Sequence, residues 1–283
     1  MGLRFEKWQA LGNDYVILER ERLPFELTAE RVRRICQPHF GCHSDGVLLL
    51  GRPTDERFAA DLRIFNPDGS EAELSGNGAR EAVLYLRRRG WADEDSFSIS
   101  TPAGPVTPTI TSPRTCSVAM GRASLASADF PSGPPDGRGT VTAGGRTFEF
   151  QHVSIGNPQC VIEAGDELEG LDLTALGPPI ERSELFPNRT NVAFIRIDSD
   201  HDVRARIFER GVGETLSSGT GASASAVTAF LRGARSPLTV ELDGGELEVE
   251  VSDELDVTLT GWAEPVFAGE FSDEFLATLE SAT

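Results

Sequence analysis

Lysine is almost missing from this sequence of 283 residues. Lys7 is the only one, so all the other basic residues, 26 with Lys7 included, are arginine. A pyridoxal-phosphate enzyme forms a Schiff base through a lysine. Lys7 lies in a stretch expected to form the first strand, before any glycine-rich loop that could cradle a phosphate. The sequence therefore nearly excludes pyridoxal catalysis, and we expect no cofactor.

Long apolar runs are also missing. None approaches the ~20 residues that a membrane-spanning helix needs, and the first residues lack the basic-then-apolar order of a signal peptide. The net charge of −19 repels phosphate backbones and anionic lipids. Hydrophobic residues make up 39% of the chain and charged residues 25%, which is typical of globular proteins. We therefore expect a cytoplasmic globular protein with neither nucleic acid nor membrane as a partner.

Cysteine and histidine are scarce and scattered. The four cysteines are Cys36, Cys42, Cys116 and Cys160. The four histidines are His39, His43, His152 and His201. The cysteine spacing fits no CxxC metal site, and the histidines include no HExxH pair. We expect no metal ion, and we expect the thiols to be buried fillers of the core.

What the sequence does contain is an internal repeat. Residues 63–79 read RIFNPDGSEAELSGNGA and residues 206–222 read RIFERGVGETLSSGTGA, and an offset of 143 aligns them without a gap. A second match upstream pairs ALGNDYVI, around Gly12, with SIGNPQCVI, around Gly156, at an offset of 144. Two matches in the same order at nearly one offset indicate two homologous halves.

The two halves predict the same order of elements. Each half should open with a strand that carries a Gly-Asn turn, continue through further strands and reach a Ser-Gly-x-Gly turn that begins a helix. Strands are expected at residues 46–50, 61–65, 191–197 and 203–208. Helices are expected at 78–89 and 221–232, because Gly90 and Gly233 supply the usual stop signal. Both helices are rich in Ala, Val and Leu, so we expect core helices wrapped by strands, and after residue 264 a strand and a short amphipathic helix.

The repeated Ser-Gly-x-Gly turn indicates a binding site for an anion. The free N–H groups and the dipole at a helix N-terminus favour negative charge, and a substrate carboxylate would fit there. Two such turns facing each other would place one side chain on either side of the substrate. Epimerisation needs this geometry, since one group removes a proton and the other returns one to the opposite face. A single turn would be weak support, because serine is also a common helix N-cap.

These residues resemble the diaminopimelate epimerase family. The matching segments, in family order, lie at residues 10–17, 40–50, 65–80, 154–161, 188–195 and 209–224. The resemblance implies an α/β (α+β) fold of two pseudo-symmetric halves, each a curled, mostly antiparallel sheet around a central helix. We expect one half at residues 1–120, with 265–283 packing back on it, the other at 121–264, and the active site in the cleft between them.

The resemblance also implies a set of substrate-binding residues. The family's asparagines for the ends of the amino acid match Asn13, Asn66, Asn157 and Asn191. The pair that recognises the distal ammonium and carboxylate matches Glu209 and Arg210. The turn residues that donate to the reacting carboxylate match Gly76, Asn77, Gly219 and Thr220. Any one asparagine could equally be a turn residue, but six polar residues in family register favour binding.

The sequence departs from the family where the chemistry occurs. The two positions that hold the catalytic cysteines are Ser75 and Ser218 here, and the histidine of the family's GNPH motif is Gln159. The catalytic set implied by the resemblance is therefore Ser75, Ser218, Glu209 and Gln159. A serine alkoxide is several pK units more basic than a thiolate, so two unaided serines should abstract an α-proton poorly.

Three readings of this departure stay open. We favour epimerisation of LL- to meso-diaminopimelate, in the lysine and peptidoglycan precursor pathway, with an amino acid as the small-molecule partner and a homodimer as one possible assembly. A related isomerase or dehydratase could use the two serines on another substrate. A catalytically silent binding protein is the third reading. Serines engineered to trap substrate are disfavoured, because other positions also differ from the commonest pattern.

Overall fold

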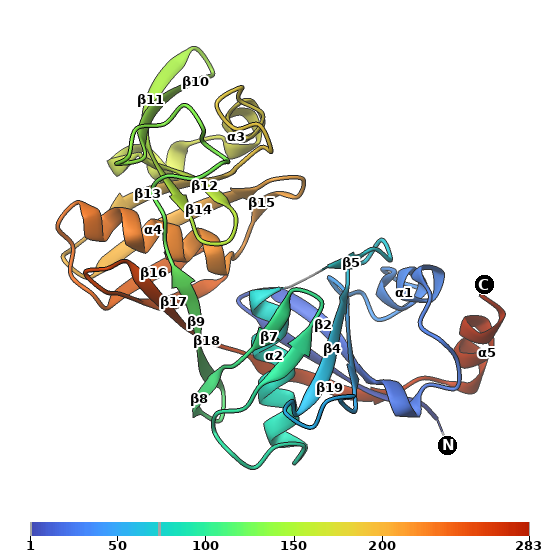
Figure 1. The fold of residues 1–283 in the computed structure, drawn as a ribbon. Helices are drawn as coiled ribbons and strands as arrows, with labels where there is room; N and C mark the ends of the chain where they lie inside the picture. Colours follow the sequence, from blue (N-terminus) through green and yellow to red (C-terminus); the bar gives the residue numbers. More distant parts are fainter. Residues whose placement is uncertain (1, 73–74, 283) are drawn as a thin grey trace. The chain divides into compact units, whose positions relative to one another are not determined.

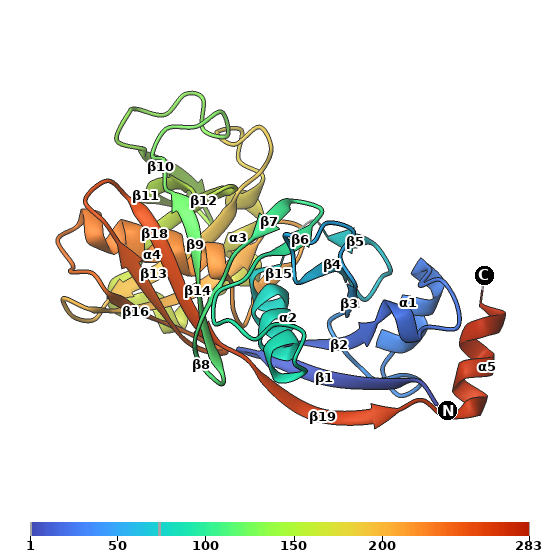
Figure 2. The same ribbon diagram turned by 60° about the horizontal axis from the view of Figure 1, so that its bottom comes forward.

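The chain folds into two units, each organised around one buried helix (Figures 1 and 2). The structure is a computed structural model that describes residues 2–72 and 75–282. The first unit comprises Met1–Val118 with Gly261–Thr283, and the second comprises Ala119–Thr260. The sequence placed the divisions at 120/121 and 264/265. Glu73 and Leu74, which belong to the segment that resembles the family, lie outside the described residues.

The first unit is built on one sheet. Its strand order is β19-β1-β2-β3-β4-β6-β7, and β5 pairs with β4. The strands are β1 (Arg4–Ala10), β2 (Asn13–Glu19), β3 (Val47–Gly51), β4 (Ala60–Phe65), β5 (Glu71–Ala72), β6 (Ile99–Thr101), β7 (Gly104–Val106) and β19 (Glu264–Glu270). The helices are α1 (Ala29–Cys36), α2 (Gly76–Arg88) and α5 (Asp273–Ser281), with a 3₁₀ turn, η1 (Arg20–Arg22). The hairpin of β8 (Thr109–Ser112) and β9 (Thr115–Arg122) follows, and the division between the two units falls within β9, after Val118.

The second unit repeats this plan. Its sheet runs β10-β11-β12-β13-β14-β16-β17-β18, and β15 pairs with β14. The strands are β10 (Arg138–Ala143), β11 (Arg146–Ser154), β12 (Pro158–Glu163), β13 (Asn191–Ile197), β14 (Asp202–Glu209), β15 (Gly213–Thr215), β16 (Leu238–Leu242), β17 (Gly245–Val251) and β18 (Asp256–Trp262). The helices are α3 (Leu173–Glu181) and α4 (Gly219–Leu231), with a 3₁₀ segment, η2 (Gly165–Gly170).

Strand pairing confirms the duplication. The parallel pairs β2–β3 and β4–β6 of the first unit have parallel counterparts β12–β13 and β14–β16 in the second. The register repeats as well, since Val47 pairs with Phe65 and Val192 pairs with Phe208. The expected strands are confirmed to within a residue or so at each end, as β3, β4, β13 and β14.

The two expected core helices are α2 and α4. Each begins two residues earlier than expected, because the serine of the turn caps the helix and the glycine after it is already helical. Nearly all of α4 from Gly221 to Ala229 is buried, and strands on several sides pack against it (Figure 1). The α2 helix is buried in the same way, but it also encloses Arg80 and Glu81, which the apolar pattern did not predict.

The C-terminal strand and helix are confirmed as β19 and α5. Strand β19 pairs antiparallel with β1, and the rings of Phe5 and Phe271 stack with centroids 4.6 Å apart. Arg31 of α1 donates to the carbonyl oxygens of Leu279 and Glu280 at the end of α5. These contacts tie the last residues to the rest of the first unit. Within the described residues, no helix is both long and apolar enough to cross a membrane.

Three of the four cysteines are buried, as expected of core fillers, and Cys42 is half-buried. Burial raises the pKa of the Cys36 and Cys116 thiols to about 11, so both stay protonated at neutral pH. A protonated, enclosed thiol is a poor nucleophile. Their environment suits a packing role.

Candidate active site

The first turn caps helix α2 with the side chain of Ser75. Its Oγ accepts a hydrogen bond from the Gly78 backbone N–H at 3.1 Å. The first N–H groups of a helix have no acceptor within the helix, so this end can bind an anion. Gly76 is exposed there, and Asn77 is buried beside it.

Polar side chains from β2 join this turn. Asn77 Nδ2 donates to Asn13 Oδ1 at 3.2 Å, and Asn13 Nδ2 in turn donates to Asp45 Oδ2 at 3.0 Å. The hydroxyl of Tyr15 donates to Ser75 Oγ at 3.3 Å. The side chains of Asn13 and Tyr15 are also hydrogen-bonded to each other, so residues 13, 15, 75 and 77 form one connected group, which we call the N-terminal half-site.

The second turn caps helix α4 with Ser218. Its Oγ accepts from the Gly221 backbone N–H at 3.2 Å, and its side chain also hydrogen-bonds the carboxylate of Glu209. Burial raises the pKa of Glu209 above its usual value, and the bond to Ser218 offsets part of that rise. A Cβ at position 221 would lie 2.5 Å from Ile207 Cδ1, so any larger residue there would have to displace the end of the Ile207 side chain on β14.

An amide network completes this C-terminal half-site. Asn157 Nδ2 donates to Thr220 Oγ1 at 3.3 Å, the counterpart of the Asn77–Asn13 bond in the first unit. Gln159 Nε2 donates to Asn157 Oδ1 at 2.7 Å and to Thr220 Oγ1 at 3.2 Å. Gln159 is fully buried, and its Oε1 has no hydrogen-bond partner within the described part of the chain. The same two positions of the repeat are therefore hydrogen-bonded in both halves, as Asn13 with Asn77 and as Asn157 with Thr220.

The two residues that follow Glu209 make three hydrogen bonds, two from the backbone and one from the Arg210 side chain. Arg210 N donates to Asn191 Oδ1 at 2.9 Å, and Arg210 Nη1 donates to the Asn188 carbonyl at 2.9 Å. Gly211 N donates to Glu181 Oε1 at 3.0 Å, and the Glu181 carboxylate is itself only 2% exposed. These bonds fix the place at which Glu209 and Arg210 leave β14.

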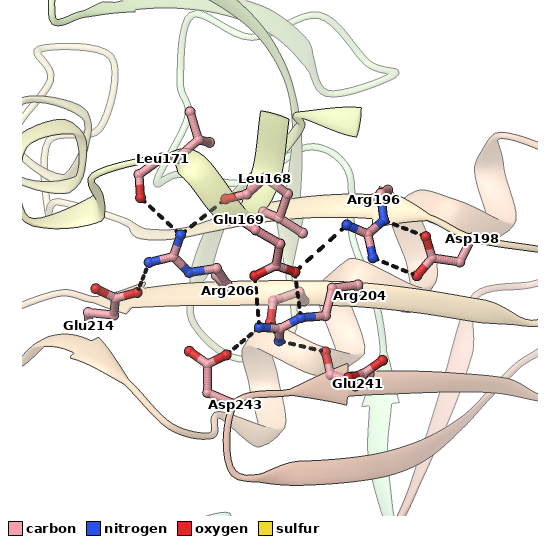
Figure 3. A network of polar contacts seen from close by, with 11 residues as sticks. Leu168, Glu169, Leu171, Arg196, Asp198, Arg204, Arg206, Glu214, Glu241 and Asp243 are labelled. Carbon is pink, nitrogen blue, oxygen red and sulfur yellow. Dashed lines mark hydrogen bonds and ion pairs between the residues drawn. The ribbon is translucent and has the colours of Figure 1, made fainter. Parts of the chain in front are cut away.

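A repeated ion pair anchors the hairpin that precedes each turn. Arg63 forms a two-pronged pair with Glu71, at 2.7 and 2.8 Å. Its counterpart Arg206 pairs with Glu214 at 2.5 Å and also donates to the carbonyls of Leu168 and Leu171 (Figure 3). The identity of these arginines and glutamates in the two halves therefore has a structural cause. Each pair joins the two strands that lead to a capping serine.

The second-unit pair belongs to a larger network. Figure 3 shows Arg204 between the carboxylates of Glu169 and Asp243, and Arg196 bridging Glu169 to Asp198. The network links η2 to neighbouring strands. It joins elements of the sheet rather than residues of the half-site.

Two of the expected binding residues have local partners. Asn66 Nδ2 donates to Ser70 Oγ at 3.0 Å within the β4–β5 turn, which is the turn role that any single asparagine could have. Asn191 Oδ1 accepts a hydrogen bond from the Arg210 backbone N–H. An open groove in the second unit, lined by residues of β10, β11 and β12, contains none of the expected site residues.

Sequence reasoning missed Tyr15 and Glu181. Tyr15 stands two residues after Asn13, at the repeat position of Gln159, so the 144-residue offset could have singled it out. Glu181 had no motif to mark it, because its role comes from the loop that packs against it.

Two similar units, each with a serine-capped helix N-terminus, define an epimerase-like fold, and a probable proline racemase from Agrobacterium radiobacter shares it. That structure aligns with a TM-score of 0.65 at 16% identity, covering 96% of this chain and 93% of the other. The family is set by sequence: the diaminopimelate epimerase model matches residues 5–126 and 151–266. The chain belongs to the diaminopimelate epimerase family, which is a family of isomerases.

Curated relatives match over almost the whole chain. Diaminopimelate epimerase 2 of Nostoc sp. is 39% identical over 280 residues, which is 97% of this chain and 98% of the relative. The diaminopimelate epimerase of Aromatoleum aromaticum is 39% identical over 275 residues, covering 95% and 99%. These relatives support epimerisation of an amino acid as the broad activity.

Proposed function

We propose that this protein epimerises diaminopimelate at an α-carbon, with Glu209 and Ser218 as the proton-accepting pair and Ser75 as the proton donor on the opposite face. The hydrogen bond between Ser218 and Glu209 carries the proposal. It gives one of the two serines the neighbouring base that a hydroxyl needs. The nearly full-length similarity to proteins named diaminopimelate epimerase supports the substrate.

The raised pKa of Glu209 favours this role. A general base works best when its pKa lies near the working pH, because it is then ionised yet basic enough to take a proton. A buried carboxylate moves in that direction. The weakness expected of two unaided serines is therefore reduced on the side of Ser218.

The helix N-termini would hold the reacting carboxylate. The backbone N–H groups of Gly76 and Asn77 at α2, and of Gly219 and Thr220 at α4, would stabilise the negative charge that moves onto the carboxylate when the α-proton leaves. Asn13, Asn66, Asn157, Asn191 and Arg210 would bind the polar groups of the substrate. That the two serines face each other across one cleft, about two contact distances of ~3–3.5 Å apart, stays a prediction.

The reaction needs no cofactor. Lys7, the only lysine, forms an ion pair with Asp14 at 2.9 Å and donates to the carbonyl of His43, so its ammonium group is committed to structural contacts. Homodimer formation and a cytoplasmic location stay predictions.

Proton-to-deuteron exchange at the α-carbon tests the proposal. The protein is incubated in heavy water with LL- or meso-diaminopimelate, and proton NMR follows the α-proton signal. Glu209→Gln should lower the exchange rate by ~10²-fold or more, the usual scale for a positioned base. Glu248→Gln, which changes an exposed glutamate of β17 in the same unit, is the matched control and should exchange as wild type does.

Other outcomes would favour the other readings. A new unsaturated product in the same NMR tubes would support a dehydratase or related isomerase. Calorimetric binding of diaminopimelate without exchange would support a silent binding protein. Equal binding of alanine, proline and diaminopimelate would contradict the assigned substrate.

A further inference from the structure

The two capping serines have opposite hydrogen-bond polarity. Ser75 Oγ accepts twice, from the Tyr15 hydroxyl at 3.3 Å and from the Gly78 N–H at 3.1 Å. A hydroxyl has two acceptor lone pairs and one proton, so Ser75 keeps its proton for a third group. Ser218 Oγ accepts from the Gly221 N–H in its own turn, and its side chain also hydrogen-bonds the carboxylate of Glu209, which accepts when it is ionised.

This difference arises because the repeat is broken at two positions. Tyr15 corresponds to Gln159, and Glu209 corresponds to Asn66, at offsets of 144 and 143. The N-terminal half-site therefore has a phenol beside its serine, and the C-terminal half-site has a carboxylate. The phenol supplies a proton, whereas the carboxylate takes one.

The environment of Tyr15 keeps its hydroxyl protonated. Its side chain is 5% exposed, and burial raises its pKa to about 12. A phenol of this kind is neutral at any physiological pH and can only lose its proton to a stronger base. A serine alkoxide is such a base, since an aliphatic alkoxide is more basic than a phenolate.

We propose that Tyr15 is a positioning residue that makes Ser75 the proton donor, resting on the proposed epimerisation. As the α-carbanion takes the Ser75 proton, a C–H bond forms, the Ser75 O–H bond breaks and its electron pair stays on Oγ. The Tyr15 proton moves to that oxygen, and the charge comes to rest on the phenolate. Water then returns a proton to Tyr15, and the hydroxide ion left behind takes the proton that Glu209 removed from the substrate, which restores the starting state.

The two half-sites are therefore not interchangeable. The Glu209 side removes the α-proton and can also return it to the same face, which exchanges the proton without inverting the carbon. Only delivery from Ser75 inverts it. A loss on the Ser75 side should separate exchange from epimerisation.

Tyr15→Phe tests this, and the chain offers a matched control. Tyr85, the only other tyrosine, is as buried as Tyr15, and its hydroxyl donates to Glu19 Oε1 at 2.7 Å, outside both half-sites. In heavy water with diaminopimelate, Tyr15→Phe should lower epimerisation by ~10-fold or more, while the isomer deprotonated by Glu209 still exchanges its α-proton at nearly the wild-type rate. Tyr85→Phe should change neither rate. A merely structural role for Tyr15 would lower both rates together.

A second measurement reports the contact without activity. With tyrosine labelled by ¹³C at Cζ, the Tyr85→Phe variant assigns the two ring signals at neutral pH. In a separate Ser75→Ala variant that keeps both tyrosines, the Tyr15 signal should move and that of Tyr85 should stay in place. An unmoved Tyr15 signal, or wild-type epimerisation by Tyr15→Phe, would overturn the proposal. If the signal moves but the wild-type protein neither exchanges nor epimerises any isomer, the proposed function is wrong. The positioning role of Tyr15 in that reaction is then wrong as well, although its contact with Ser75 is confirmed.

Discussion

Glu81 should make the stability of this protein fall as pH rises. Glu81 is a fully buried residue of α2, and neither of its carboxylate oxygens has a hydrogen-bond partner among the described residues. Burial raises the pKa of Glu81 well above its usual value, with the charges of Asp14 and Asp45 adding to the rise and Arg80 opposing it. The carboxyl group is therefore neutral in the folded state and ionises when the chain unfolds above its ordinary pKa.

The sign follows from proton counting. Above the unfolded value of 4.5 and below the raised folded value, the folded state holds one more proton than the unfolded state. The contribution of Glu81 is complete below pH 4.5, and it is lost as pH rises toward the folded pKa. The loss amounts to ~1.4 kcal/mol per pH unit within that window. Glu81→Gln has no titrating group at this position, so it should gain stability relative to wild type as pH rises above 4.5, by up to ~1.4 kcal/mol per pH unit until the folded pKa is reached.

Urea unfolding at fixed salt measures this difference. Trp8, Trp91 and Trp262 all lie in the unit that contains Glu81, so intrinsic fluorescence reports on that unit. The glutamine is also a buried polar group, but its cost is the same at every pH, so the slope decides. Glu94→Gln, an exposed change in the same unit, is the control and should run parallel to wild type. Parallel curves for Glu81→Gln would refute the reasoning and show that Glu81 is ionised beside Arg80.

Three further predictions follow from charge and packing. Ser75→Cys with Ser218→Cys should raise diaminopimelate epimerisation by ~10²-fold or more in an NMR assay, with less than half the logarithmic gain from either change alone; no gain in a variant that still binds would contradict the substrate. Raising KCl from 0.1 to 2 M should raise the melting temperature measured by circular dichroism, because salt screens the repulsion of a −19 chain; a flat or falling curve would oppose this. Arg206→Ala should destabilise by ~2 kcal/mol in urea, since its side chain is 14% exposed and its removal takes one donor from each of the Leu168 and Leu171 carbonyls. Arg63→Ala, whose side chain is 44% exposed, should change stability by less than ~1 kcal/mol; equal losses would refute the reasoning.

Much of the fold could be predicted because the signals are local. The expected helices and strands depend on apolar periodicity, a capping serine and a terminating glycine, which act between residues near each other in the chain. The two-unit plan was visible because a duplication leaves the same residues at the same spacing. The starts of α2 and α4 were misplaced by two residues, since the cap fixes the first helical residue and the apolar pattern begins later.

The candidate site, like the fold, could be predicted from the sequence only in part. The sequence singled out both serines and the glycines after them because they stand in a repeated turn, and it singled out Glu209 because of the resemblance to the family. It could not identify Tyr15 as the partner of Ser75, since 60 residues separate them and only the packing of β2 against α2 brings the two oxygens within 3.3 Å.

The sequence by itself thus determined the duplication, the family and the two serine-capped turns. Only the tertiary structure decided which groups donate to and accept from each serine hydroxyl, and that the Glu81 side chain on α2 is fully buried. The physical reason is that hydrogen-bond direction and pKa depend on which groups surround an atom in space. Those neighbours come from strands and loops far away in the chain, and they are set when the sheet curls around its helix.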